Sequence, residues 1–315
     1  MILCAGEALI DMLPVEGPGG QTAFRPVPGG AVFNTAIALG RLGVPTGFWG
    51  GISRDQMGAR LMSALSAAGV DCQAVTRSER PTTLAFAEMK DGVATYRFED
   101  ENSATRMLTP ADIPPIEPPV RALFCGGIGL ATDPCGAAFE ALATNARQVA
   151  DLPVMIDLNI RPALVEDAAR YRARLARMMA LADIVKLSTE DLDWLFGRAD
   201  RQDQARWARG LLAAGGATRL VVITDGAAGA RGYSAAGEHD EPAPPVRVVD
   251  TIGAGDTFNA GLLAGLWSAG MLTRAALARL DLAALAAAMG LGAAAAAITV
   301  GRAGADPPWK EEVWR

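Results

Sequence analysis

The stretch "DTIGAGDTFNAG" at residues 250–261 indicates more about this chain than any other. It follows the apolar run "PPVRVV", which has strand character, and it precedes "LLAGLW", which has helical character. Glycines at the start of a helix let backbone N–H groups converge on one point, where the helix dipole favours negative charge. The stretch therefore predicts an anion site between a strand and a helix, formed by Gly253, Ala254 and Gly255.

Asp256 stands at the same point and gives that anion site a more specific meaning. A carboxylate beside an anion site repels the anion, which is an odd choice for a turn that only binds phosphate. It makes sense if Asp256 takes a proton from a hydroxyl group that attacks a phosphoryl group. The alternative is that Asp256 only caps the helix and the glycines only permit the turn.

A second glycine-rich turn, "PGGAVFNTAIALGRLG" at 28–43, also opens a helix. Gly29 and Gly30 allow a ligand to approach the backbone closely, and Asn34 offers both a donor and an acceptor to a pair of sugar hydroxyls. Taken alone, an Asn in a helix is more often simply solvated. Asp11 is the better polar candidate, because we expect it at the end of the first strand, where strand ends face the ligand crevice.

Strand-like runs alternate with helical patterns along the chain, which predicts an α/β fold with a mostly parallel sheet covered on both faces. The strand-like runs lie at 2–10, 46–51, 121–127, 153–159, 183–188 and 219–226, and the clearest helical patterns at 55–68, 136–150 and 203–214. Residues 12–28 and 82–98 interrupt this order, the latter as two alternating strands with a turn at Lys90-Asp91-Gly92. We expect these two pieces to form a small lid over a small-molecule site.

Composition limits the classes of partner. Half of the 315 residues are apolar and a fifth are charged, as in a globular protein, and the net charge of −6 argues against a nucleic-acid partner. Four scattered cysteines and one histidine argue against a zinc site or a disulfide framework and fit a cytoplasmic protein. The uncharged stretch at 282–300 is mostly Ala and Gly, so we expect a packed internal helix and no membrane span.

The two glycine-rich turns, "GGAVFNTA" and "DTIGAGDTFNAGLL", together resemble the two characteristic motifs of the ribokinase-like sugar kinases, the PfkB carbohydrate kinase family. Further matching pieces extend the resemblance over almost the whole chain: "GEALID" at 6–11, "DLNIRP" at 157–162, "KLSTED" at 186–191, "VVITDGAAGA" at 221–230 and "GADPP" at 304–308.

The resemblance implies one ribokinase-like kinase domain over residues 1–315, a three-layer α/β/α core with a small β-sheet lid inserted from about 12–28 and 75–108. Such kinases transfer the γ-phosphoryl group of ATP to a sugar hydroxyl. Asp256 would be the catalytic base, with Gly253, Ala254 and Gly255 as the anion hole. The residues that would bind the sugar are Asp11, Gly29, Gly30, Asn34 and Arg161, and the alternative for Arg161 is a salt bridge to a nearby carboxylate.

The same resemblance assigns the nucleotide and the metal. Ser188, Thr224, Gly226 and Gly229 would contact ATP. Ser188 and Asp191 stand where many relatives carry Asn and Glu on the water shell of Mg²⁺, so Asp191 is a candidate metal ligand through water. A monovalent cation such as K⁺ near "ITVGRAGADPP" and a homodimer formed through the lid are further expectations.

Which sugar is phosphorylated is the harder question, because the motifs look most like the branch of fructokinases and 2-keto-3-deoxygluconate kinases. The latter substrate is an acid. Tyr96 and Arg97 would suit it, but Glu99, Asp100 and Glu101 would repel a carboxylate if they faced it, which favours fructose. Asn102 either bonds sugar hydroxyls or simply forms a turn. A non-catalytic sugar-binding protein on the same fold is the rival from another class.

Overall fold

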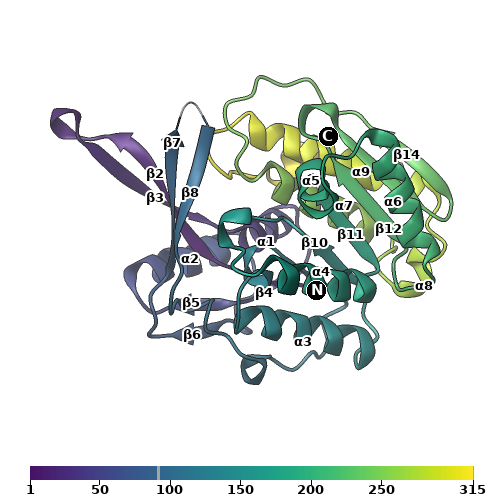
Figure 1. Cartoon of the computed structure of the whole chain (residues 1–315), viewed down its shortest axis with the longest axis horizontal. Coiled ribbons are helices and arrows are strands. Elements are labelled where there is room, and N and C mark those ends of the chain that lie inside the picture. The colour runs from purple at the N-terminus through teal and green to yellow at the C-terminus, as the bar shows by residue number, and fades with distance from the viewer. Residues whose placement is uncertain (91–92, 315) are drawn as a thin grey trace.

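The structure is a computed structural model that describes residues 1–90 and 93–314. An eight-stranded sheet forms the centre of the fold (Figure 1). The strand order is β14-β13-β12-β11-β10-β9-β1-β4, parallel from β4 to β12 and antiparallel at the β12-β13-β14 edge. Its strands are β1 (Ile2–Ala5), β4 (Thr46–Trp49), β9 (Ala122–Gly126), β10 (Val154–Asp157), β11 (Ile184–Ser188), β12 (Leu220–Thr224), β13 (Ala230–Ser234) and β14 (Gly237–Glu241). The mostly parallel sheet predicted from the alternation is confirmed.

Helices cover both faces of this sheet, because alternate strand residues point to opposite sides and each side needs an apolar cover. One face carries α1 (Ala31–Arg41), α2 (Gln56–Ala67), α7 (Ala254–Ser268), α8 (Arg274–Leu277) and α9 (Leu282–Val300). The other carries α3 (Cys135–Gln148), α4 (Ala168–Leu181), α5 (Thr189–Phe196) and α6 (Arg201–Ala213). A short helix, α10 (Lys310–Val313), follows. The three-layer α/β/α core is confirmed.

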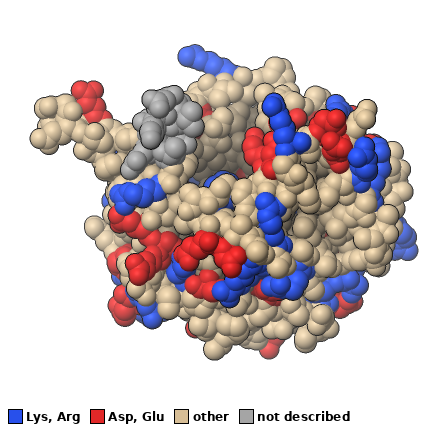
Figure 2. Space-filling model, viewed as in Figure 1, with Lys and Arg blue, Asp and Glu red and all other residues tan. Residues whose placement is uncertain are grey.

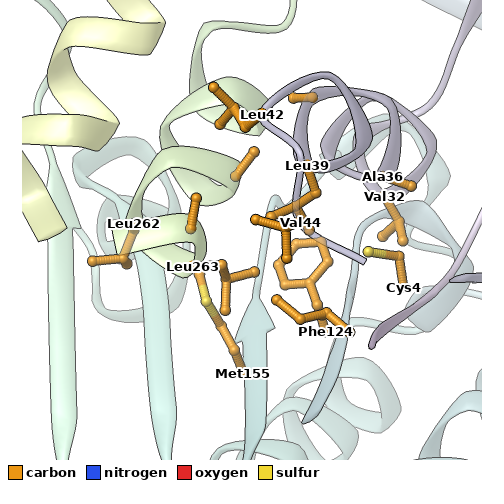
Figure 3. Close-up of a cluster of buried hydrophobic side chains, with 14 of the residues drawn as sticks. Cys4, Val32, Ala36, Leu39, Leu42, Val44, Phe124, Met155, Leu262 and Leu263 are labelled. Carbon is orange, nitrogen blue, oxygen red and sulfur yellow. The ribbon is translucent and has the colours of Figure 1, made fainter. Parts of the chain in front are cut away.

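The apolar core between the sheet and the helices on its first face brings α1 and α7 together (Figure 3). Leu39 of α1 and Leu263 of α7 lie over Phe124 and Met155 of the sheet. These four side chains are almost fully buried. The two helices that begin at the glycine-rich turns are therefore fixed side by side, which places both turns at one end of the sheet.

Helix α9 coincides with the uncharged stretch at 282–300 and packs against α7. A Cβ atom on Gly261 would lie 2.6 Å from the Cα of Gly292, and one on Gly265 would lie 2.6 Å from the Cα of Ala288. Small residues thus let the two backbones approach closely. By length and composition α9 is apolar enough to cross a bilayer; here it packs against α7, with 39% of its most apolar stretch buried.

The lid is a separate four-stranded sheet that projects from one side of the core (Figure 1). Its order is β3-β2-β7-β8, with β2 (Leu9–Glu16), β3 (Thr22–Gly29), β7 (Thr83–Lys90) and β8 (Val93–Glu99). The predicted turn at Lys90-Asp91-Gly92 falls on residues 91–92, outside the described part of the chain. Residues 76–78 form β6, which pairs with β5 (Gly51–Ser53) apart from the lid, so the lid sheet is narrower than the predicted 75–108.

Two predictions about strands are wrong. The run at 2–10 does not form one strand, because β1 ends just before Gly6. A Cβ atom on Gly6 would lie 2.4 Å from Cγ2 of Val32. Asp11 therefore lies in lid strand β2 and not at the end of a core strand. The run at 244–249 forms no strand, and Pro244 and Pro245 have no N–H to donate to a sheet.

Candidate active site

A cleft of about 830 Å³ lies between the lid and the carboxyl ends of the parallel strands, where ligands bind in such sheets. The face seen in Figure 2 is hollowed beside the lid. The lid contributes Asp11, Tyr96 and Phe98 to the lining of the cleft. The core contributes the first turns of α1 and α7 and the loops that follow β10, β11 and β12. The two glycine-rich turns of the sequence therefore meet in one site.

The first turn of α7 is the predicted anion hole. Gly253 caps this helix in the left-handed conformation, with φ 76°, and a Cβ atom there would lie 2.7 Å from Cβ of Ala305. Glycine is needed at this position for both reasons. Gly253, Ala254 and Gly255 all line the cleft, and N–H groups in the first turn of a helix have no partner within it. The Ala254 N–H donates to the Thr251 carbonyl oxygen at 3.3 Å, and the turn presents a positive helix end to the cleft.

Asp256 follows directly and is buried, with 7% of its surface exposed. Its Oδ2 accepts a hydrogen bond of 2.9 Å from Nδ2 of Asn34, so the carboxylate is held by another helix rather than by the start of its own. Asn34 is itself buried, which argues against the solvated alternative. Burial raises the pKa of Asp256 to about 7, although the Asn34 bond lowers it. A carboxyl group with such a pKa accepts protons near neutral pH.

Four of the predicted sugar-binding residues, Asp11, Gly30, Asn34 and Arg161, line the cleft, whereas Gly29 does not. Gly29 leaves room for Asp11, because a Cβ atom on Gly29 would lie 2.0 Å from Oδ2 of Asp11. Gly30 caps α1 with φ 109°. Burial raises the pKa of Asp11 to about 6, and the facing Arg161 guanidinium opposes that rise. The structure thus brings Asp11, Asn34 and Arg161 to one part of the cleft.

The side chains of lid strand β8 and of the residues after it do not lie as the prediction about an acidic substrate assumed. Tyr96 and Phe98 line the cleft, with ring centroids 6.2 Å apart. Arg97 lies instead 4.5 Å over the ring of Phe86 and bonds Glu99 at 2.7 Å, away from the cleft. The acidic residues at 99–101 do not line the cleft either, so they would not contact an acidic substrate there.

Asn102, predicted either to bond the sugar or simply to form a turn, lies in a turn outside the cleft. Asn102 is exposed in a turn with φ 56° and does not line the cleft. Asn tolerates this left-handed conformation better than most residues, so the turn explains its presence.

Two cleft residues that sequence reasoning missed are Phe98 and Glu7. Glu7 is buried and its Oε1 accepts a 2.7 Å bond from the Ala31 N–H at the start of α1.

The remaining predicted residues, Ser188, Asp191, Thr224, Gly226 and Gly229, also line the cleft. The wall beside them is apolar and is formed by Ala243, Val246 and Val248 of the loop before α7 and by Ala293, Ala296, Ala297 and Val300 of α9. Such an apolar wall suits the flat face of a nucleotide's heterocyclic base. Strand β12 ends at Thr224, so the following glycine turn opens directly toward this wall.

Ser188 and Asp191 also have a structural role that the metal assignment did not anticipate. They form a capping box at the start of α5, in which Ser188 Oγ accepts from the Asp191 N–H and Asp191 Oδ2 accepts from the Ser188 N–H. Asp191 Oδ1 accepts a further bond of 2.7 Å from the Ile160 N–H. Both carboxylate oxygens thus already bind the backbone, which leaves Asp191 suited to a contact through water.

Comparisons with known proteins agree with this geometry. The family model described as pfkB family carbohydrate kinase matches residues 1–312. The chain is 47% identical over 283 residues to a fructokinase of Rhizobium leguminosarum bv. trifolii, covering 89% of this chain and 84% of that protein.

Solved structures of two fructokinases have the same fold. The fructokinase of Xylella fastidiosa with bound ATP has a TM-score of 0.88 at 30% identity, with 99% of this chain and 96% of that chain covered. A double variant of the Vibrio cholerae O395 fructokinase, bound to fructose, ADP and a potassium ion, has a TM-score of 0.83 at 26% identity, with 96% and 93% covered. The chain described here belongs to the pfkB family of carbohydrate kinases.

Proposed function

We propose that this protein is an ATP-dependent fructokinase in which Asp256 is the catalytic base. The observation that carries the proposal is the meeting of Asp256, the first turn of α7 and Asn34 in one cleft. This arrangement combines a buried proton acceptor with an anion site, as phosphoryl transfer to a hydroxyl group requires. The relatives described above support the choice of sugar, because those named are fructokinases.

In the proposed mechanism Asp11, Asn34 and Arg161 hold the sugar with one hydroxyl beside Asp256. The Asp256 carboxylate takes the proton of that hydroxyl while the hydroxyl oxygen forms a bond to the γ-phosphorus of ATP. The bond from that phosphorus to the bridging oxygen breaks, and ADP carries away the electron pair. The N–H groups at Gly253, Ala254 and Gly255 stabilise the charge on the transferred group.

Magnesium would enter this site with ATP. Among the residues at 1–90 and 93–314, no group of three or more His, Cys, Asp or Glu could hold a metal ion alone. Asp191 lines the cleft with lone pairs still open to water, so it fits an ion that is held mainly by phosphates and water. When bound, Mg²⁺ neutralises charge on the phosphates during transfer.

A panel of acceptors tests the sugar assignment. We expect ADP release from magnesium-ATP to be fastest with fructose and much slower with 2-keto-3-deoxygluconate, tagatose, ribose and adenosine. The keto-acid is a serious alternative, because Arg161 lies in the cleft and no acidic side chain of 99–101 faces it. Faster turnover of the keto-acid than of fructose would replace the proposed substrate while leaving the kinase assignment intact.

The pKa of Asp256 gives a pH prediction. Because burial raises that pKa to about 7, the carboxylate is the minor form in acid and the major form in base. We expect kcat/KM for fructose to fall about tenfold for each pH unit below about 6, with a midpoint near 7. A pH profile measured from about pH 5 to 9 checks this. A midpoint near the ordinary aspartate value would show that Asp256 is not the group that limits activity.

Replacement of Arg161 tests the sugar side of the cleft. We expect Arg161→Gln to lower kcat/KM for fructose by about tenfold or more, because it removes the guanidinium that faces Asp11 and the bound sugar. The matched control is Arg80→Gln, a loss of the same charge at an exposed position away from the cleft. Equal kinetics for Arg161→Gln and wild type would remove Arg161 from the site.

We further propose that the protein works in the cytoplasm, where ATP and reduced thiols are found, and that it forms a homodimer through the lid. A potassium ion near residues 298–308 is also proposed, supported by the potassium-bound fructokinase structure. The rival function is a non-catalytic sugar-binding protein. It predicts fructose binding without any ADP release from magnesium-ATP.

A further inference from the structure

A buried charged cluster lies beneath the floor of the cleft and has no role in the account above. It consists of Lys186 on β11, Asp157 on β10 and Asn259 on α7, with 3%, 1% and 0% of their surfaces exposed. Asp157 and Lys186 are partners in the parallel pairing of their strands. Asp157 Oδ2 receives hydrogen bonds from Nζ of Lys186 at 3.0 Å and from Nδ2 of Asn259 at 2.7 Å.

This cluster sits directly below the proposed anion hole and base. A Cβ atom on Gly255 would lie 3.5 Å from Nζ of Lys186, so the ammonium group lies against the first turn of α7, and Lys186 also lines the cleft. Asn259 lies three residues after Asp256 on that helix and ties it to β10. The cluster therefore joins the turn that carries Asp256 to two strands of the sheet.

Stability alone is a poor explanation for such a cluster. Removing charges from water is costly, and buried ion pairs can often be replaced by apolar residues without loss of stability. Within residues 1–90 and 93–314, two oxygens in the cluster, Oδ1 of Asp157 and Oδ1 of Asn259, find no hydrogen-bond partner, which adds to the cost. Groups kept at such a cost beside a reactive carboxylate point to a task in the reaction.

We propose that Lys186, Asp157 and Asn259 form a positioning device: Lys186 keeps Asp256 in its ionised form, and Asp157 and Asn259 hold Lys186 and the first turn of α7 in place. The proposal rests on the proposed function, in which Asp256 is the base. Lys186 acts through Asp256 and is not itself assigned a contact with the sugar or the transferred group.

The charges around Asp256 determine the expected effects. Cations face it from β11, as Lys186, and from the loop after β10, as Arg161. Carboxylates face it from β10, as Asp157, and from the segment between β1 and β2, as Glu7. On α5, Asp191 interacts with both Asp157 and Lys186.

Burial is the main reason that the pKa of Asp256 is raised. Asp157 raises it further, and Lys186 lowers it. Burial by itself would lower the pKa of Lys186, but the neighbouring carboxylates Asp157, Asp191 and Asp256 raise it overall, so Lys186 remains a cation. Removing Lys186 and removing Asp157 should therefore change the titration of Asp256 in opposite directions.

The test compares Lys186→Met, Asp157→Asn and the double variant. The titration of Asp256 is followed by NMR in protein labelled with ¹³C at the aspartate carboxyl carbon, without sugar or ATP, and Asp256→Asn identifies the signal. We expect the Asp256 midpoint to rise by about one pH unit in Lys186→Met, to fall in Asp157→Asn, and to return close to the wild-type value in the double variant. Shifts in the same direction, or no shift, would overturn the proposal.

Kinetics give a second readout that a merely structural role would not produce. We expect Lys186→Met to lower kcat about fivefold at neutral pH and to recover activity above about pH 9, where Asp256 is again ionised. Lys186→Arg keeps the charge and should keep the midpoint near the wild-type value. If Lys186→Met does not fold, a rise or no change of the midpoint in Asp157→Asn still contradicts the proposal.

The NMR titration needs no catalysis, so the two hypotheses can fail separately. Opposite shifts in a protein that phosphorylates no sugar would leave the positioning device intact and reject the proposed function. Sugar phosphorylation by the wild-type protein, together with no change of the Asp256 titration midpoint in the variants, would support the proposed function and reject the positioning device.

Discussion

Asp256→Asn will lower kcat for fructose phosphorylation by at least about 10²-fold, because the amide keeps the size of the carboxylate but cannot accept the proton of the attacking hydroxyl. The amide oxygen can still accept the hydrogen bond that Asn34 donates to Oδ2 of Asp256. The geometry of the cleft should therefore persist while the chemistry is lost. ADP release from magnesium-ATP measures the effect, with Asp203→Asn, a surface carboxylate paired with Arg206, as the matched control.

The same variant should not lose stability at alkaline pH, which separates lost chemistry from lost folding. The pKa of Asp256 is about 7 in the folded chain, above its ordinary value of 3.8. The folded state therefore binds this proton more tightly than the unfolded state, and the free energy of unfolding falls as the pH rises from about 4 to about 7. Asp256→Asn lacks this pH-dependent loss, so its Tm at about pH 8 should equal or exceed that of wild type.

A lower Tm for Asp256→Asn together with lower activity would indicate that the carboxylate is structural. Wild-type activity in this variant would exclude Asp256 as the base. Both outcomes are readily distinguished by thermal unfolding and ADP release measured on the same preparation.

Gly253→Ala is the second substitution with a large expected effect. Alanine at φ 76° is strained, and its Cβ atom would lie 2.7 Å from Cβ of Ala305, so the first turn of α7 must move. We expect kcat to fall about 10²-fold because displaced N–H groups no longer stabilise the transferred group. The free energy of unfolding should also fall, by more than the roughly 1 kcal/mol that left-handed alanine costs.

Helix α7 offers a matched control at its other end. Gly270 has φ 68°, and among the residues that the structure describes a Cβ atom there would meet nothing within 4 Å. Gly270→Ala should therefore lose about 1 kcal/mol of stability with kcat unchanged. Equal kinetic effects of the two substitutions would show that the loss comes from general destabilisation and not from the anion hole.

Local patterns in the sequence predict the layered core and the two glycine-rich turns well, because both depend on neighbouring residues. Apart from 244–249, the strand-like runs before helices each contain a strand, and α7 begins where Gly253 and Gly255 predict. The antiparallel edge β13-β14 escaped prediction, since its strands carry many polar residues and short runs of that kind resemble loops.

The composition of the site was harder to predict, because it depends on contacts between distant residues. The bond between Asn34 and Asp256 joins helices 222 residues apart, and only the family resemblance indicated that the two turns share a site. Lys186 and Asp157 stand in matched motifs, but no local pattern shows that they pair across two strands under α7.

Two assignments show how a local structural signal can be overlooked. Ser188 and Asp191 have the spacing of a capping box, which was readable in the sequence, although the family resemblance pointed to the water shell of a metal. Asn102 was readable as a turn residue for the same reason. In both cases the simpler structural role is the one that the fold displays.

The most direct test of the central claim is a ³¹P NMR spectrum of the wild-type protein incubated with fructose, ATP and magnesium. The account predicts a new phosphomonoester signal that grows as ADP forms, requires fructose, and is absent with Asp256→Asn. Fructose binding by calorimetry without any such signal would contradict it and favour the non-catalytic sugar-binding protein.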